Sequence, residues 1–263
     1  MRMSGISVSG GRGATIIVAR SKVYKIYVGY NARRRLEIEV TGNKLIRKEF
    51  CFADVIVPIH RSRFVPNALV MQRGSPVYKS STKEIRMFVR DLYRKAYAES
   101  VYGAAISIFG DRVLAPEVVA GDWEGIGDRV QSVLSSLRIP IGPMHGDIHL
   151  GNIVEIDGAY KLIDCNRARR SGSPIIDVVH YVVENEVSCH HAQWVDRLGS
   201  STCRSITEEL TCSDYGRWES YVMLYALWRI SAEISSLKLR RRLSPNRIKK
   251  YRNAVAKYVL HVT

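Results

Sequence analysis

Three polar side chains in the middle of the sequence have types and spacing suited to phosphoryl transfer. Asp147 lies in the run His-Gly-Asp-Ile-His-Leu-Gly-Asn, which ends at Asn152, and Asp164 follows twelve residues after Asn152. Phosphoryl transfer needs a carboxylate that orients or deprotonates the acceptor hydroxyl, and oxygen ligands for Mg²⁺ ions that offset the phosphate charge. Asp147 can be the catalytic base, and Asn152 and Asp164 are hard oxygen ligands suited to Mg²⁺. The alternative is that Asp147 merely caps a turn.

A second set of residues, near the start of the chain, could hold the phosphates of a nucleotide. Gly10, Gly11 and Gly13 form a glycine-rich turn between two apolar runs that predict strands. Backbone N–H groups of such a turn can approach a phosphate closely because no Cβ stands in the way. Lys25 lies in the second strand-like run after this turn, in Val-Tyr-Lys-Ile, from which it can reach the α- and β-phosphates. The alternative for the glycines is an ordinary β-turn.

An acidic residue on the helix that follows should hold the ammonium group of Lys25. Glu37 and Glu39 stand 12 and 14 residues after Lys25, and both are candidates. Glu37 is the preferred partner. Glu49, or no acidic partner, remains as a further alternative.

The elements that must position these side chains divide into a β-rich and a helical part. β-branched and aromatic runs predict strands, and apolar residues at helical spacing predict helices. The predicted strands are 6–8, 15–18, 23–28, 55–59, 68–71 and a hairpin at 153–163 turning at Asp157-Gly158. The predicted helices are 31–52, 81–108, 123–137 and 174–186, with two more starting at Asp214 and Ser244. We therefore expect an α+β chain with a small lobe over residues 1–74 and a larger helical lobe over residues 75–263.

The composition is that of an ordinary globular protein. The chain has 263 residues, of which 46% are hydrophobic and 25% charged, and this excludes a disordered or fibrous chain. No uncharged apolar run reaches the ~18–20 residues that a membrane-spanning helix needs, and no signal-peptide pattern opens the sequence. The five cysteines are odd in number and irregularly spaced, which favours reduced thiols. We expect a cytoplasmic protein.

The net charge of +15 favours anionic partners such as nucleotides or phosphate-rich surfaces. Basic residues are densest between Lys238 and Arg252, and no nucleic-acid-binding motif accompanies them. A solvated basic face explains this segment most simply. An anionic partner of the C-terminal segment is the alternative.

The motifs around Asp147, Asp164 and Lys25 resemble those of kinase-like phosphotransferases of the aminoglycoside phosphotransferase and choline kinase type. The resemblance covers residues 6–186. It is carried by His-Gly-Asp-x-x-x-x-Asn followed by Ile-Asp, and more weakly by Val-Tyr-Lys-Ile. It implies a two-lobed protein-kinase-like fold that binds ATP and Mg²⁺ in the cleft, with Lys25 as the phosphate anchor.

The resemblance also implies roles for residues that carry no reactive group of their own. Residues 68–74, with Met71 and Arg73, resemble the hinge strand that holds adenine through backbone hydrogen bonds. Because the base is read by the backbone, ATP and GTP remain alternatives. Asp177 resembles the family's structural aspartate that braces the catalytic loop, and His145 resembles a histidine that supports the same loop.

Several departures from ordinary protein kinases point to a small acceptor. Gly146 replaces the usual arginine, Cys165 and Asn166 replace Phe-Gly, and only twelve residues separate Asp164 from Asp177, too few for an activation loop. The resemblance thus implies an ATP- and Mg²⁺-dependent kinase that phosphorylates a hydroxyl of a sugar, amino alcohol or aminoglycoside-like molecule. A compact atypical Ser/Thr protein kinase is the first alternative, and a nucleotide-binding pseudokinase or scaffold is the second.

The acceptor-binding residues follow no pattern in the sequence. His149 lies inside the predicted catalytic loop and is a candidate for a substrate contact. Glu184 and Glu186 are the acidic residues of the segment after Asp177, and they could attract a cationic acceptor.

Overall fold

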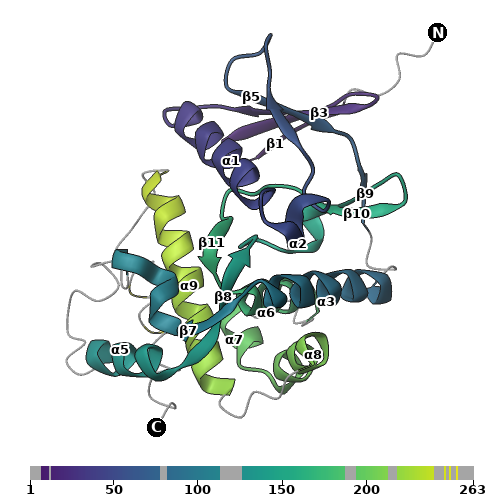
Figure 1. Ribbon diagram of the computed structural model, residues 1–263. Coiled ribbons are helices and arrows are strands. Elements are labelled where there is room, and N and C mark those ends of the chain that lie inside the picture. Colours follow the sequence, from purple (N-terminus) through teal and green to yellow (C-terminus); the bar gives the residue numbers. More distant parts are fainter. Residues whose placement is uncertain are drawn as a thin grey trace.

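The first part of the chain forms a five-stranded antiparallel sheet that carries one long helix (Figure 1). The strand order is β1-β2-β3-β5-β4, with bounds β1 (Ser7–Gly11), β2 (Ala14–Val18), β3 (Lys22–Tyr27), β4 (Ile59–Arg61) and β5 (Ala68–Gln72). Helix α1 (Ala32–Ile46) places Ala32, Leu36 and Val40 on one face because they are four residues apart. These side chains pack with Tyr27 and Leu69 of the sheet. The predicted strands at 15–18, 23–28 and 68–71 correspond to β2, β3 and β5.

The computed structural model describes residues 7–11, 13–77, 82–112, 126–186, 194–212 and 218–239, and residues 246, 249 and 253 singly. The predicted helix starts at Asp214 and Ser244, and most of the basic C-terminal segment, lie outside these residues. The anionic partner of that segment stays a prediction. The division of the chain at residue 74 also stays a prediction.

Two predictions for the first part were wrong in detail. The helix expected over 31–52 is two helices, α1, which ends at Ile46, and the short α2 (Phe50–Ala53), because the extended backbone of Glu49 separates them. Residues 55–58 are not in a strand of the sheet, and only Ile59, the first residue of β4, is. Instead, Val57 donates its N–H to the carbonyl of Leu162, and Leu162 donates to that of Val55, at 2.9 and 2.8 Å. These two bonds tie the first part of the chain to the hairpin of β9 (Ile153–Ile156) and β10 (Ala159–Leu162).

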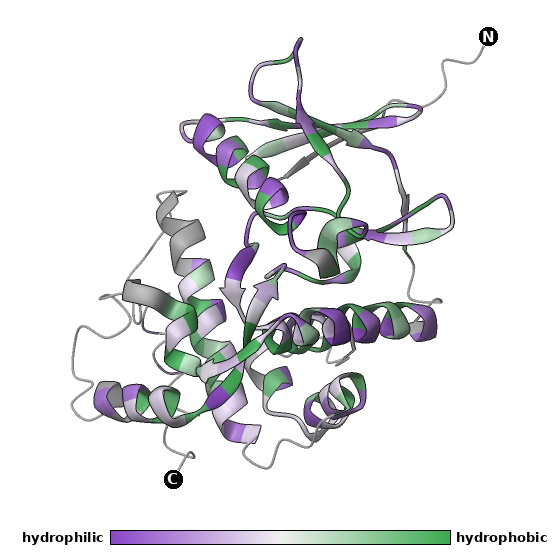
Figure 2. Ribbon diagram, in the orientation of Figure 1, coloured by the Kyte–Doolittle hydropathy of each residue, from purple (hydrophilic) through white to green (hydrophobic). Residues whose placement is uncertain are grey.

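The second part of the chain is mainly helical and surrounds a small sheet (Figure 1). Its helices are α3 (Thr82–Ala98), α5 (Ile126–Ser136), α6 (Pro174–Tyr181), α7 (Trp194–Leu198), α8 (Ser201–Thr211) and α9 (Trp218–Leu239), and a π-helical turn (Val182–Glu186) extends α6. Strands β7 (Val101–Ala104), β8 (Arg138–Met144) and β11 (Arg169–Gly172) form the sheet in the order β11-β8-β7. Figure 2 shows that α6 is mostly hydrophobic, whereas α3 alternates between hydrophobic and hydrophilic residues. The core therefore lies between α3, α6 and α9.

Helix α3 is shorter than predicted. It ends at Ala98, where the Ser100 hydroxyl donates to the carbonyl of Ala96 at 2.7 Å. The remainder of the predicted helix is strand β7 and a 3₁₀ segment (Ala105–Arg112). The apolar residues of this stretch fit a strand as well as a helix, and pairing with β8 decides between them.

The predicted hairpin turn at Asp157-Gly158 is confirmed. Strands β9 (Ile153–Ile156) and β10 (Ala159–Leu162) pair across these two residues, both with positive φ, at 52° and 75°. A two-residue turn of this kind matches the twist of its strands. Strand β6 (Ser75–Pro76) adds to β9 on the other side.

Within the part of the chain that the structure describes, no helix is both long and apolar enough to cross a membrane.

Candidate active site

The segment that carries Asp147 and Asn152 lies beside the segment that carries Asp164. Asn152 ends a short 3₁₀ turn (Leu150–Asn152), and its amide Nδ2 donates to the backbone carbonyl of Asp147 at 2.9 Å. The backbone carbonyl of Asn152 accepts from the N–H of Ile163 at 3.0 Å, one residue before Asp164. The structure therefore brings the three predicted residues to one place. Residues 145–152 are the loop that the sequence predicts to be catalytic, and we keep the name catalytic loop for them.

The start of the catalytic loop is held by a buried carboxylate. The two oxygens of Asp177 accept the backbone N–H groups of His145 and Gly146 at 2.7 and 2.6 Å. Burial raises the pKa of Asp177 to about 7, while these two N–H groups act in the opposite direction. His145 Nε2 donates to the carbonyl of Ile163 at 3.1 Å. The positions of Asp177 and His145 are those that the resemblance implied.

Gly146 is required by the backbone of the catalytic loop. Its φ is +80°, and a Cβ there would come within 2.6 Å of the backbone oxygen of Arg167. A side chain would thus push apart the catalytic loop and the segment after Asp164. This explains why glycine precedes Asp147.

The carboxylate of Asp147 has two cationic or polar neighbours on the same oxygen. Arg167 Nη1 donates to Oδ1 at 3.0 Å, and His180 Nε2 lies 3.1 Å from the same atom. Burial acts to raise the pKa of Asp147, but the hydrogen bond from His180 and the charge of Arg167 outweigh it and hold that pKa well below its usual range. Asp147 is therefore ionised at neutral pH. None of the described residues donates to its other oxygen, Oδ2.

Sequence reasoning did not single out His180 or the contact of Arg167 with Asp147. One signal could have found His180: it stands three residues after Asp177 on a helix, and side chains at that spacing share a face. Arg167 carried no local signal, because its contact spans 20 residues and depends on how two loops meet. Tyr225 and Trp228 are buried, and both rings lie beside His180.

Lys25 binds Glu39 and not Glu37. Its ammonium lies 2.7 Å from Glu39 Oε2 and 2.8 Å from Asp164 Oδ2. Glu37, the preferred partner in the sequence analysis, instead pairs with Arg61 at the surface. The reason is the rotation of α1: residues two apart point about 200° away from each other, so only one of the two glutamates can face the interior. Glu39 is 1% exposed.

The Lys25 ammonium is shared by two carboxylates. Burial acts to lower the pKa of Lys25, but the charges of Asp164 and Glu39 outweigh it and raise that pKa above its usual value. Burial, together with the charge of Asp164, raises the pKa of Glu39, and Lys25 opposes this shift. Tyr27 also donates its hydroxyl to Glu39. Lys25 is therefore protonated at neutral pH and places a positive charge beside Asp164.

Helix α1 can carry Glu39 this far inward because it contains Gly42. A Cβ at Gly42 would lie 2.0 Å from the backbone oxygen of Cys165. The next residue, Asn43, donates its amide to the carbonyl of Val57 at 2.9 Å. The glycine that is unfavourable for a helix thus lets α1 pack on the segment after Asp164.

Asn152 and Asp164 fit a magnesium ion better than a metal with a full protein ligand set. The described residues contain no group of three or more His, Cys, Asp or Glu side chains that could hold a metal. Mg²⁺ commonly uses one or two carboxylates together with waters and substrate phosphates. The amide nitrogen of Asn152 is used by the loop, which leaves its oxygen as the ligand. One carboxylate and one amide oxygen are therefore a fitting donor set.

The glycine-rich turn is shorter than predicted. Gly10 and Gly11 belong to strand β1, paired with Thr15 and Ala14, and only residues 12 and 13 connect the strands. Gly13 has a φ of +90°, and its carbonyl accepts from the guanidinium of Arg35. Of the three glycines, only Gly13 is in the turn, and a phosphate contact there stays a prediction.

Of the two predicted hinge residues, Met71 lies in β5 and Arg73 directly follows its last residue. Met71 is 7% exposed and packs with Val57 and Ile156. Arg73 is exposed, and its backbone N–H donates to the carbonyl of Ser21 at 3.0 Å. Their contact with adenine stays a prediction.

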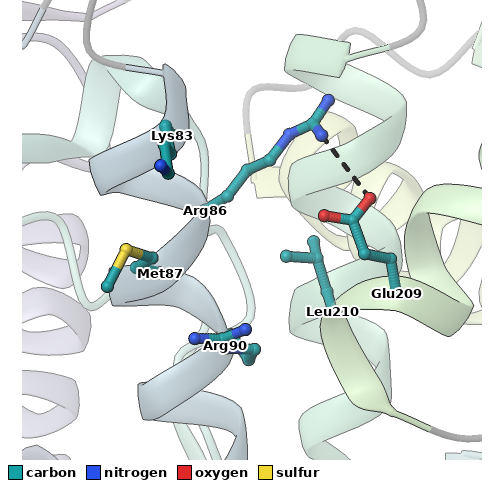
Figure 3. A pocket seen from close by; sticks show the side chains of 6 residues that line it. All are labelled: Lys83, Arg86, Met87, Arg90, Glu209 and Leu210. Carbon is teal, nitrogen blue, oxygen red and sulfur yellow. Dashed lines mark ion pairs between the residues drawn. The ribbon is translucent and has the colours of Figure 1, made fainter.

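A cavity of about 500 Å³ opens between α3 and α8 (Figure 3). Figure 3 shows Arg86 reaching across it from α3 to Glu209 of α8, an ion pair of 3.6 Å. Its lining residues are Lys83, Arg86, Met87, Arg90, Glu209 and Leu210. None of them is a predicted site residue, so the cavity is separate from the candidate active site.

The fold has close counterparts among solved structures, although no protein-family model and no curated protein matches the sequence. The choline kinase LicA from Streptococcus pneumoniae is 13% identical, with a TM-score of 0.63 over 97% of this chain and 94% of that chain. The chain has a two-lobed, protein-kinase-like fold. The predicted fold class is confirmed.

Two further structures share this fold. Aminoglycoside phosphotransferase APH(4)-Ia, a thermostable mutant in ternary complex with ADP and hygromycin B, is 12% identical with a TM-score of 0.58, over 98% of this chain and 94% of that chain. The amicoumacin kinase hAmiN, in complex with AMP-PNP, Ca²⁺ and Ami, is 13% identical with a TM-score of 0.54, over 99% and 88%. At such identities the likeness shows the fold alone.

Proposed function

We propose that this protein is an ATP- and Mg²⁺-dependent kinase that transfers the γ-phosphate to a hydroxyl of a small polar molecule. The observation that carries the proposal is the Asp147 carboxylate, ionised and anchored through Oδ1, beside a second carboxylate that holds Lys25. A base, a metal ligand and a phosphate anchor are the parts that phosphoryl transfer requires. Solved structures with the same fold include kinases and phosphotransferases in complex with nucleotides.

Each residue has one task in the proposed reaction. Asp147 Oδ2 accepts a hydrogen bond from the hydroxyl of the substrate that receives the phosphate. This bond directs the hydroxyl oxygen at the γ-phosphorus. Because the pKa of Asp147 is low, it takes the proton late, as the new P–O bond forms and the bond to the ADP oxygen breaks. Lys25 neutralises phosphate charge. Mg²⁺, held by Asn152 and Asp164, would offset the remaining charge on the phosphates.

The charges around Asp147 favour an acceptor without a positive charge. Glu184 could have attracted a cation, but its carboxylate is already paired with Arg229. The Arg229 guanidinium also lies 5.1 Å from the centre of the Trp194 ring, where an external cation could otherwise stack. Arg167 adds a further positive charge beside Asp147. A neutral or anionic hydroxyl compound, such as a sugar, fits these residues better than an amino alcohol.

The segment between Asp164 and Asp177 argues against a protein substrate. Four of its twelve residues form strand β11 (Arg169–Gly172), which pairs with β8. The segment is therefore held in the sheet β11-β8-β7, and too few of its residues remain to form a peptide-docking loop. A compact protein kinase remains the alternative that the experiment below must exclude.

The test is transfer of label from γ-labelled ATP with Mg²⁺ to a panel of sugars, sugar acids, amino sugars, aminoglycosides and generic proteins. We expect label on a neutral or anionic small molecule, and its loss in Asp147→Asn. Asp91→Asn, an exposed aspartate of α3, is the matched control and should retain transfer. Label only on protein would favour the protein kinase. Nucleotide binding without transfer to any member would favour a pseudokinase, and absence of nucleotide binding would refute the proposal.

A further inference from the structure

A chain of hydrogen bonds leads from helix α9 to the carboxylate of Asp147. Arg229 Nη1 donates to Tyr225 Oη at 3.0 Å, and it is itself held by the carboxylate of Glu184. Tyr225 Oη lies 2.8 Å from His180 Nδ1. His180 Nε2 lies 3.1 Å from Asp147 Oδ1. Five side chains from α6, α9, the π-helical turn and the catalytic loop are thus connected in series.

The direction of every bond in this chain follows from its first member. A guanidinium can only donate, so Tyr225 Oη accepts from Arg229 and has its own proton left to give. The nearest acceptor for that proton is His180 Nδ1. A neutral imidazole that accepts at Nδ1 carries its proton on Nε2, and this N–H points at Asp147. The ring is therefore in the Nε2–H form.

We propose that His180 is a positioning residue for the phosphoryl transfer proposed above, and the inference rests on that proposed function. His180 donates to Asp147 Oδ1 from α6, and Arg167 donates to the same oxygen from the segment after Asp164. Two donors on one oxygen fix the plane of the carboxylate. They leave Oδ2 turned toward the acceptor hydroxyl.

A purely structural role would not need a histidine at this position. The side chain of His180 is 3% exposed and touches the rings of Tyr225 and Trp228, a setting that an apolar residue would fill without the cost of burying two ring nitrogens. Its helical neighbours Val178 and Val179 are apolar and buried. Both polar atoms of His180 are instead matched, one to Tyr225 and one to Asp147. Because both of its ring nitrogens are hydrogen-bonded, His180 holds the Asp147 carboxylate in a single orientation.

The charged and titratable groups that face His180 come from four elements. Asp147 and His149 lie on the catalytic loop, with the His149 ring 6.2 Å from the His180 ring. Arg229 lies on α9, Arg167 on the segment after Asp164, and Glu184 on the π-helical turn. Burial and these cations lower the pKa of His180, against the effect of Asp147. The neutral ring that the bond directions require is therefore also the form that its surroundings favour.

The first experiment reads the tautomer directly, by nitrogen-15 NMR of the histidine rings in the full-length protein. We expect His180 as the Nε2–H form in the wild type. In Tyr225→Phe, which removes only the hydroxyl and keeps the ring, we expect the same form, because the Asp147 carboxylate still accepts at Nε2 and Arg229 Nη1, 3.5 Å from Nδ1, can only donate. A wild-type His180 with its proton on Nδ1 would overturn the proposal, whatever the activity.

The second experiment reads the reaction, as label transfer to the acceptor found above or, without one, as Mg²⁺-dependent hydrolysis of ATP. In His180→Leu we expect kcat to fall by about a hundredfold, because a misaligned reacting group costs that order of rate. The KM for ATP should stay within about twofold, since binding alone does not use this contact. In His180→Gln, whose amide can still donate to Asp147, we expect partial rescue.

The matched control is Tyr97→Phe, which removes the hydroxyl of an exposed tyrosine on α3 and should leave kcat unchanged. An active wild type whose His180→Leu variant is folded and equally active would refute the positioning role. So would a fall in kcat that is matched by a rise in KM for ATP. A wild type that binds no nucleotide and catalyses neither reaction would instead refute the proposed function, and the positioning role with it.

Discussion

The two ends of the candidate active site are held by different kinds of contact. At the Asp147 end, a buried carboxylate binds two backbone N–H groups, and Asp147 itself has fixed donors on one oxygen. At the Lys25 end, the ammonium group of Lys25 from β3 binds the carboxylates of Glu39 from α1 and Asp164 after β10. Backbone contacts fix a loop, whereas side-chain ion pairs can exchange partners. The Asp147 end is therefore built before any ligand arrives.

The Lys25 end must rearrange for the proposed reaction. Lys25 and Asp164 pair directly at 2.8 Å, although the proposal assigns one to the phosphates and the other to Mg²⁺. Each would exchange the other for a ligand whose charge has the same sign, so the exchange leaves no buried charge unpaired. Glu39 keeps hold of Lys25 throughout, because its carboxylate is buried beside Tyr27. The comparison predicts that changes at the two ends affect different measurements.

The largest effect should come from removing the base. In Asp147→Asn we expect kcat to fall by about 10²–10⁴-fold, because a neutral amide cannot accept the hydroxyl proton. The affinity for nucleotide should not change. In Lys25→Met both kcat and nucleotide affinity should fall, since Lys25 binds phosphate in the ground state as well. Steady-state kinetics and nucleotide titrations check both, and weaker nucleotide binding in Asp147→Asn would break the comparison.

The next effect is on the stability of the catalytic loop. Asp177→Asn replaces one acceptor oxygen with a donor that faces a backbone N–H, and leaves that buried N–H without a partner. We expect the free energy of unfolding to fall by about 2–4 kcal/mol, from the lost bond and the unsatisfied group. Urea denaturation measures it. A loss below 1 kcal/mol would show that the loop does not depend on Asp177.

The sequence predicts well those elements that depend on residues close to one another in the chain. The hairpin at Asp157-Gly158 and strands β2, β3 and β5 follow from patterns within a few residues. The proximity of Asp147, Asn152 and Asp164 follows too, because the hairpin returns the chain to the loop it left. Their catalytic roles stay proposals.

The parts that were missed depend on long-range packing. Residues 55–57 have a strand-like pattern, but they bond to Leu162 rather than to the sheet, which no local pattern records. The contacts of Asp147 with Arg167 and His180 join segments 20 and 33 residues apart. The choice between Glu37 and Glu39 depends on the rotation of α1. Gly42 allows the close approach of α1, but glycine within a helix is by itself only an unfavourable residue.

A smaller effect should appear in the pH dependence of stability. Burial lowers the pKa of His145 from 6.5 to about 4, against the charges of Asp147 and Asp164. Between these values the unfolded chain binds a proton that the folded chain does not, so acidification lowers the free energy of unfolding by about 1.4 kcal/mol per pH unit for that proton. Asp177, with its raised pKa, acts in the opposite direction over much of this range.

The contribution of His145 is therefore measured as the difference between the wild type and a variant that lacks this histidine. In His145→Gln, the slope of the free energy of unfolding against pH between 4 and 6.5 should be lower than in the wild type by about that amount. Urea denaturation at a series of pH values measures the two slopes. Equal slopes would mean that His145 is not buried as a neutral ring.

The smallest effect comes from a matched pair on one helix. Glu39→Gln removes the charge that keeps Lys25 in place when Asp164 turns to the metal, and we expect kcat/KM for ATP to fall by about tenfold, or 1.4 kcal/mol. Glu37→Gln breaks only the surface pair with Arg61, and kcat/KM should stay within about twofold. Both variants make the same chemical change two residues apart on α1. Since the two side chains point in opposite directions, equal losses would mean that α1 is rotated relative to β3, and the ion pair of Lys25 with Glu39 would have to be abandoned.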